Sequence, residues 1–199
     1  KKLLSLIKIK TIDIPIIKNP HNNDINDRRI HNYSKLNMFN LIQFDKIVYL
    51  DADMIILHNI DELFEYKNMS AVNAGGMIYK SWKDLNSGLM VIEPSKTLFN
   101  DMILKVGKIE KEKNRGDQAF LHSYFYDWSS KKDLHLPHIY NFIYLYLENY
   151  EQKFNYYISE DIQFNMNNYN DRNIKVLHFI GKNKPWNDID KLKRTKNKK

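Results

Sequence analysis

Short apolar runs bounded by turn residues alternate along this chain with segments of helical period, and this alternation constrains the fold more than any other feature. Residues 46–50, 89–92 and 174–180 are the strand-like runs, and the last is interrupted only by Lys175 and His178. Strands interleaved with helices are typical of a domain in which helices cover a sheet. The sequence therefore predicts an α/β fold.

Three segments between the predicted strands carry helical signals. A short amphipathic helix is expected to begin near Asn32 and to include Phe39 and Ile42. A second is expected after Pro94-Ser95, where a capping serine precedes apolar residues at four-residue spacing, and a third over residues 117–126. The apolar face of the second helix consists of Leu98, Met102 and Val106.

The composition supports a globular domain held together by burial. Among the 199 residues, 43% are hydrophobic, which is enough apolar mass for a core. The chain has no cysteine, which excludes a disulfide framework, a thiolate zinc site and a cysteine nucleophile. No uninterrupted apolar stretch reaches the roughly 18 residues of a membrane span, so we expect none in this chain.

The net charge of +7 comes mainly from the end of the chain. Residues 191–199 hold six Lys and Arg side chains, and taking these from the 31 basic residues leaves 25 against 24 acidic ones. We expect residues 191–199 to be a solvated, disordered tail and residues 1–190 to form the domain. The alternative, that the tail contacts nucleic acid or anionic lipid, rests on the tail alone, and we predict no nucleic-acid partner.

One long segment gives no structural signal. Residues 140–169 are rich in Tyr and Asn without clean periodicity, so we predict no regular structure there. Residues 165–173 are expected to form an exposed loop.

Asp51-Ala52-Asp53 stands where the predicted strand 46–50 stops. In an extended segment residues i and i+2 share a face, so both carboxylates can converge on one cation at the rim of the sheet. Hard oxygen ligands suit Mg²⁺ or Mn²⁺ bridging to a phosphate, and open α/β sheets bind ligands at the carboxyl ends of their strands. The alternative is that Asp51 or Asp53 only caps a turn.

Three other motifs allow a functional and a purely structural interpretation. Asn86-Ser87-Gly88 stands before the strand 89–92, either to admit a ligand to the backbone or as a tight turn. Gly116-Asp117-Gln118 opens a helix, where Asp117 would ordinarily be the N-cap. His178 in an apolar strand, with Lys184 following, combines a metal-binding group with a phosphate-binding cation, although such a histidine is more often a satisfied core residue.

Taken in order, these segments resemble the glycogenin-like glycosyltransferases, glycosyltransferase family 8, and the resemblance runs over most of the chain. It implies a Rossmann-like GT-A domain and a Mn²⁺ ion, with Mg²⁺ as an alternative. It also implies transfer of a hexose, glucose first, from a UDP-sugar to a glycan or protein hydroxyl, with retention of configuration. The matching landmarks are Tyr33-Ser34-Lys35-Leu36, residues 45–53, residues 59–64, Asn86-Ser87-Gly88, Gly116-Asp117-Gln118, Leu136-Pro137 with Tyr140-Asn141, and residues 178–186.

Position by position, the resemblance implies a role for each candidate. Asp51, Asp53 and His178 are the expected metal ligands. Asp117 and Gln118 are the expected catalytic residues, which position the sugar and stabilise charge near its anomeric carbon. The expected substrate-binding residues, with Lys184 and the Gly181 backbone facing the diphosphate, are Lys35, Ala52, Asn86, Ser87, Gly88, Gly181 and Lys184.

The chain departs from the family pattern in two places. Members begin with a strand-helix-strand unit, and the match starts after it, so we expect either a fragment of a longer protein or a degenerate copy. Asn114 also stands where such enzymes commonly carry an acidic residue. The alternative function is therefore a catalytically inactive relative that serves as a binding or scaffold module. The resemblance slightly favours the cytoplasm and allows a homodimer.

Overall fold

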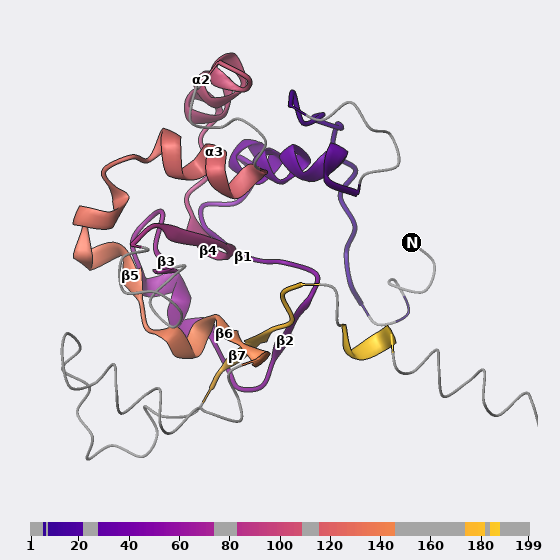
Figure 1. The fold of residues 1–199 in the computed structure, drawn as a ribbon, viewed down its shortest axis with the longest axis vertical. Helices are drawn as coiled ribbons and strands as arrows, with labels where there is room; N and C mark the ends of the chain where they lie inside the picture. Colours follow the sequence, from indigo (N-terminus) through magenta and orange to yellow (C-terminus); the bar gives the residue numbers. More distant parts are fainter. Residues whose placement is uncertain are drawn as a thin grey trace, which may run out of the picture. The chain divides into compact units, whose positions relative to one another are not determined.

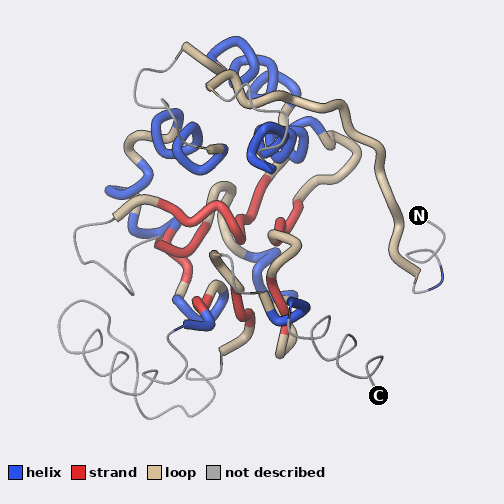
Figure 2. The backbone as a smooth tube through the Cα atoms, turned by 45° about the vertical axis from the view of Figure 1, so that its right-hand side comes forward, coloured by secondary structure: helices blue, strands red, loops and turns tan. Residues whose placement is uncertain are grey.

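The computed structural model describes residues 6, 8–21, 28–73, 83–108, 116–145, 174–181 and 184–187. The chain divides into two compact units. The helical unit comprises Lys1–Asp45 and Pro94–Phe125, and the sheet unit comprises Lys46–Glu93 and Tyr126–Lys199. All strands of the described residues, red in Figure 2, belong to the sheet unit.

The helical unit is built on η1 (Arg28–Asn40), a 3₁₀-helix of 13 residues. Tyr33, Leu36 and Phe39 recur every three residues, which places them on one stripe of a helix with three residues per turn, and all three are fully buried. The Tyr33 ring packs on Phe120 with centroids 5.9 Å apart. The predicted helix is thus present, but it begins earlier than Asn32 and ends before Ile42, which is exposed.

The other two helices of this unit match their predictions closely. Ser95 caps α2 (Lys96–Lys105), because its Oγ accepts a hydrogen bond from the Leu98 N–H at 3.3 Å. Met102 is buried and Leu98 half-buried, as the apolar spacing predicts. α3 (Asp117–Tyr124) ends two residues before the predicted boundary.

The first sheet of the sheet unit has the order β1-β4-β3-β5 (Figure 1). β4 pairs antiparallel with both β1 and β3, whereas β3 pairs parallel with β5. Residues 89–92, the second half of β4, are completely buried. The four strands are β1 (Ile47–Leu50), β3 (Ala71–Asn73), β4 (Leu85–Ile92) and β5 (His135–Leu136).

The second sheet has the order β2-β7-β6, with β2 antiparallel and β6 parallel to β7. Its strands are β2 (Met54–Ile56), β6 (Phe142–Ile143) and β7 (Val176–His178). Short 3₁₀-helices connect the strands of the unit: η2 (Asp61–Glu65), η4 (Trp128–Ser130), η5 (Lys132–Leu134) and η6 (His138–Tyr140).

A three-residue link, Asp51-Ala52-Asp53, carries the chain from β1 in the first sheet to β2 in the second. The Asp51 N–H donates to the Gly88 carbonyl of β4 at 2.7 Å, and the Phe179 N–H donates to the Asp53 carbonyl at 2.9 Å. The Met54 N–H donates to the Asp51 carbonyl at 3.3 Å and closes a turn. The link is therefore a turn tied to both sheets, and the prediction of an extended segment was wrong.

Two predicted strands differ from the observed ones in length. β4 starts at Leu85, so Asn86-Ser87-Gly88 lies inside a strand and does not form the tight turn considered as an alternative. β7 covers only Val176–His178 of the predicted 174–180, whereas β1 confirms 46–50 to within one residue.

The segment 140–169, predicted to lack regular structure, begins with the last residue of η6 and contains the short strand β6. Residues 146–173, including the predicted loop 165–173, lie outside the described residues, as do Asn114 and the predicted tail 191–199. Among the described residues, no helix has both the length and the apolar character needed to cross a membrane.

Candidate functional site

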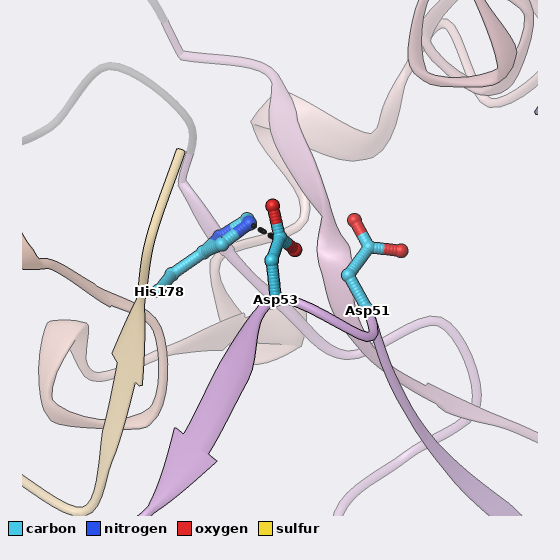
Figure 3. Close-up of side chains that lie close together, drawn as sticks. All are labelled: Asp51, Asp53 and His178. Carbon is cyan, nitrogen blue, oxygen red and sulfur yellow. Dashed lines mark ion pairs between the residues drawn. The ribbon is translucent and has the colours of Figure 1, made fainter. Parts of the chain in front are cut away.

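Asp51 and Asp53 lie in the link between the two sheets, and His178 ends β7 directly opposite Met54 in the β2–β7 register. One ligand atom of each of these three side chains lies within 4.8 Å of the other two. In Figure 3 the His178 ring reaches toward Asp53, and the Asp51 carboxylate stands on the other side of Asp53. Residues far apart in the sequence therefore form one cluster.

The chemistry of this cluster fits a divalent metal ion. Two carboxylates supply hard oxygen ligands, and the imidazole adds a nitrogen that suits Mn²⁺ and other transition metals better than Mg²⁺. His178 Nε2 lies 3.3 Å from Asp53 Oδ1, and His178 is only 5% exposed. One ring nitrogen of His178 thus faces a carboxylate of the cluster, as a metal ion shared by both side chains would require.

Lys184 also contacts the cluster. Its Nζ donates hydrogen bonds to Asp53 Oδ2 and to the Phe179 carbonyl. Burial acts to raise the pKa of Asp53, but the hydrogen bond from Lys184 and the charges of His178 and Lys184 outweigh it and hold that pKa below its usual value. Asp53 is therefore ionised at neutral pH, as metal binding requires.

Gly88, predicted to bind substrate, lies against His178, and Asn86, another predicted substrate-binding residue, is bonded to Gly88. The Gly88 N–H donates to Asn86 Oδ1 at 2.8 Å. A Cβ built on Gly88 would stand 2.6 Å from His178 Cε1, so only glycine lets β4 approach the imidazole this closely. Asn86 and Gly88 thus border the metal cluster.

Sequence reasoning missed two residues of this site. Asn141 donates through Nδ2 to Asn86 Oδ1 at 3.0 Å, and its Oδ1 lies 2.9 Å from His178 Nδ1. The Tyr49 hydroxyl donates to Asp51 Oδ1 at 2.7 Å. Asn141 was visible only as part of the Tyr140-Asn141 landmark, and Tyr49 as a strand aromatic, so neither carried a chemical signal of its own.

The remaining candidates of the sheet unit have different surroundings. Ala52 is the middle residue of the link, and Ser87 is buried in β4. Gly181 is exposed with a φ of +84°, a left-handed conformation that favours glycine, and apart from its neighbours in sequence no other residue of the described part of the chain lies within 4 Å of a Cβ built there.

Lys35, Asp117 and Gln118 belong to the helical unit. Lys35 Nζ and Asp117 Oδ2 form an ion pair at 2.7 Å, with side chains only 11% and 13% exposed. Asp117 is the first residue of α3 and Gly116 is its N-cap, so the interpretation of Asp117 as an ordinary N-cap was wrong. Gln118 follows in the first turn of the helix.

The chain is similar to a known protein family and to several of its members. A family model described as Glycosyl transferase family 8 matches residues 1–190. The chain is 34% identical to mouse glycogenin-1 over 156 residues, which is 77% of this chain and 41% of that protein. It is 41% identical to inositol phosphorylceramide glucuronosyltransferase 1 of Arabidopsis thaliana over 133 residues, 66% of this chain and 23% of that protein.

Solved structures share the fold. The galactosyltransferase LgtC, crystallised with donor and acceptor sugar analogs, superposes with a TM-score of 0.57 and 20% identity over 86% of this chain and 67% of LgtC. The chain spans less than half the length of the curated relatives described above.

Proposed function

The chain belongs to glycosyl transferase family 8, and from this premise we propose that it transfers a hexose from a UDP-sugar to a hydroxyl acceptor with the help of a divalent metal ion. Its structural neighbours are glycosyltransferases of the GT-A type, which confirms the predicted fold class. The single observation that carries the proposal is the cluster of Asp51, Asp53 and His178 with Lys184 beside it.

We propose that Asp51, Asp53 and His178 hold Mn²⁺, which supplies positive charge where the diphosphate leaves. In this proposal Lys184 exchanges its hydrogen bond to Asp53 for one to the diphosphate, next to the Gly181 backbone. Breaking the sugar–phosphate bond leaves additional negative charge on UDP, and the Lys184 ammonium group at the diphosphate stabilises that charge more in the transition state than in the bound donor.

The sugar-binding roles of the other candidates are part of the same proposal. As the resemblance to the family implies, Lys35, Asp117 and Gln118 position the donor sugar, with Asp117 and Gln118 near its anomeric carbon, and Ala52, Asn86, Ser87 and Gly88 also bind the donor. The acceptor hydroxyl attacks the anomeric carbon from the face that UDP leaves, so the configuration is retained. The carbon–oxygen bond to UDP breaks, the bond to the acceptor oxygen forms, and the acceptor proton passes to the departing phosphate.

The metal cluster is tested by Asp51→Asn and Asp53→Asn. Each removes a carboxylate charge without changing the size of the side chain, so Mn²⁺-dependent UDP binding should disappear while both variants still unfold in one cooperative thermal transition. Asp61→Asn, an exposed acid at the start of η2, is the matched control and should bind as the wild type does. Unchanged calorimetric UDP binding in both cluster variants would overturn the proposal.

The donor sugar is proposed to be glucose, and hydrolysis of UDP-glucose, UDP-glucuronate, UDP-galactose and UDP-xylose with Mn²⁺ tests this choice. Glucuronate is the second candidate, because several curated relatives are glucuronosyltransferases by name. Mn²⁺-dependent UDP binding without hydrolysis of any donor would instead support a catalytically inactive binding module.

A further inference from the structure

A series of three hydrogen bonds connects the backbone of β4 to the His178 imidazole. It starts at the Gly88 N–H, which can only donate. The Asn86 side-chain atom that lies 2.8 Å from it must therefore be the carbonyl oxygen. This contact with the backbone fixes the orientation of the Asn86 amide.

The second step fixes Asn141. Asn86 Oδ1 lies 3.0 Å from the Asn141 side chain, and an acceptor needs a donor there, so Asn141 presents its Nδ2. Its Oδ1 must then face His178 Nδ1, at 2.9 Å. Asn141 is only 3% exposed, so water competes poorly for these contacts.

The third step assigns the proton of the imidazole. Because Asn141 Oδ1 can only accept, His178 Nδ1 must carry a hydrogen, and the neutral ring then keeps a lone pair on Nε2. Nε2 is the nitrogen that lies 3.3 Å from Asp53 Oδ1, on the side of the metal cluster. Asp53 is the competing acceptor for the proton, but its contact is longer and its other oxygen already accepts from Lys184.

We propose that Asn86 and Asn141 are positioning residues, which hold His178 as the Nδ1–H tautomer and leave Nε2 to bind the metal. This inference deepens the proposed function and rests on the metal site proposed there. It also gives Asn86 a task separate from sugar binding, since its Oδ1 is already bonded to Gly88 and Asn141. Partners of this kind typically change metal affinity about 10- to 100-fold.

The test uses the full 199-residue chain, labelled with ¹⁵N-histidine and free of metal. Long-range ¹H–¹⁵N spectra, recorded at a pH where the imidazole is neutral, report which nitrogen of His178 carries the proton. The wild type should show Nδ1–H. Asn86→Leu removes the acceptor and should shift the population toward Nε2–H and weaken Mn²⁺ binding about 10- to 100-fold.

The matched variant is Asn86→Asp, which keeps an oxygen for Gly88 and Asn141. It should retain the Nδ1–H signal and bind Mn²⁺ at least as tightly as the wild type. An Nε2–H signal in the wild type, or an unchanged tautomer in a folded Asn86→Leu variant, overturns the inference. If Asn86→Leu does not fold, the wild-type and Asn86→Asp spectra decide. A wild type that shows Nδ1–H but binds no Mn²⁺ contradicts the proposed function and not the tautomer.

Discussion

Lys184 donates a hydrogen bond to Asp53, so the lysine proposed to contact the diphosphate is bonded to a proposed metal ligand. The same ammonium group also donates to the Phe179 carbonyl, next to the strand that carries His178. A metal ion bound as we propose would therefore compete with Lys184 for the Asp53 carboxylate until a diphosphate gave the lysine another partner.

Lys184→Ala should bind Mn²⁺ about 3- to 10-fold more tightly than the wild type when no UDP is present, because a competing cation is gone, while sugar transfer becomes slower. Calorimetry of Mn²⁺ binding and initial rates measure the two effects. Lys67→Ala removes an equal charge from an exposed pair with Asp133 and should leave both unchanged. Weaker Mn²⁺ binding by Lys184→Ala would contradict the competition.

Gly88→Ala should weaken Mn²⁺ binding about 10- to 100-fold, because the new methyl group would overlap the His178 ring and push the imidazole away from Asp53. Metal titration followed by calorimetry checks this. Thermal unfolding of the same variant monitors the fold. Wild-type affinity in a folded Gly88→Ala variant would mean that the ring can move without loss of the site.

The pair of Lys35 and Asp117 should show strong coupling in a double-mutant cycle. Lys35→Met takes from the nearly buried Asp117 carboxylate its partner at 2.7 Å, and should lower the free energy of unfolding by about 1–3 kcal/mol. Adding Asp117→Asn should recover part of that loss. Urea unfolding measures the cycle, and the exposed pair of Lys67 and Asp133 should show no measurable coupling. Additive effects at Lys35 and Asp117 would argue against a stabilising pair.

His138 should make the sheet unit less stable in mild acid. Burial, with a smaller effect of the His135 charge, lowers the pKa of His138 to about 4, whereas an unfolded chain has a histidine pKa of about 6.5. The neutral His138 side chain therefore contributes fully to stability above pH 6.5, and this contribution is lost as the pH falls toward 4. The free energy of unfolding should fall by at most about 1.4 kcal/mol per pH unit on this account.

The check on His138 is a comparison of urea unfolding between pH 7 and pH 4 in the wild type and in His138→Gln. The glutamine cannot take up the proton, so its free energy of unfolding should fall less steeply with decreasing pH. Identical slopes would mean that His138 titrates alike in the folded and unfolded chains.

Local chemistry made part of this structure predictable from the sequence. β1 is a run of β-branched and aromatic residues, and Ser95 caps α2 as its position indicates. The order of motifs indicated the family, which the family model confirms. It also predicted that Asp51, Asp53 and His178 bind one metal ion together, and the three side chains do lie in one cluster.

The rest depends on contacts between distant segments. Asn86-Ser87-Gly88 has the composition of a turn, yet it continues β4, because β4 pairs with a strand on each side. The two acids meet His178 through a turn held by Gly88 and Phe179, not through the alternation of an extended strand. Asn141 approaches His178 across 37 positions of sequence, a separation that no local pattern encodes.

The link that carries Asp51 and Asp53 is the direct covalent passage from β1 to β2, and His178 sits on the neighbour of β2. An ion bound by all three side chains would cross-link the two sheets at the point where the chain passes from one to the other. Titrating the ion should then raise the midpoint of thermal denaturation of the sheet unit, because an ion that binds only the folded protein stabilises it.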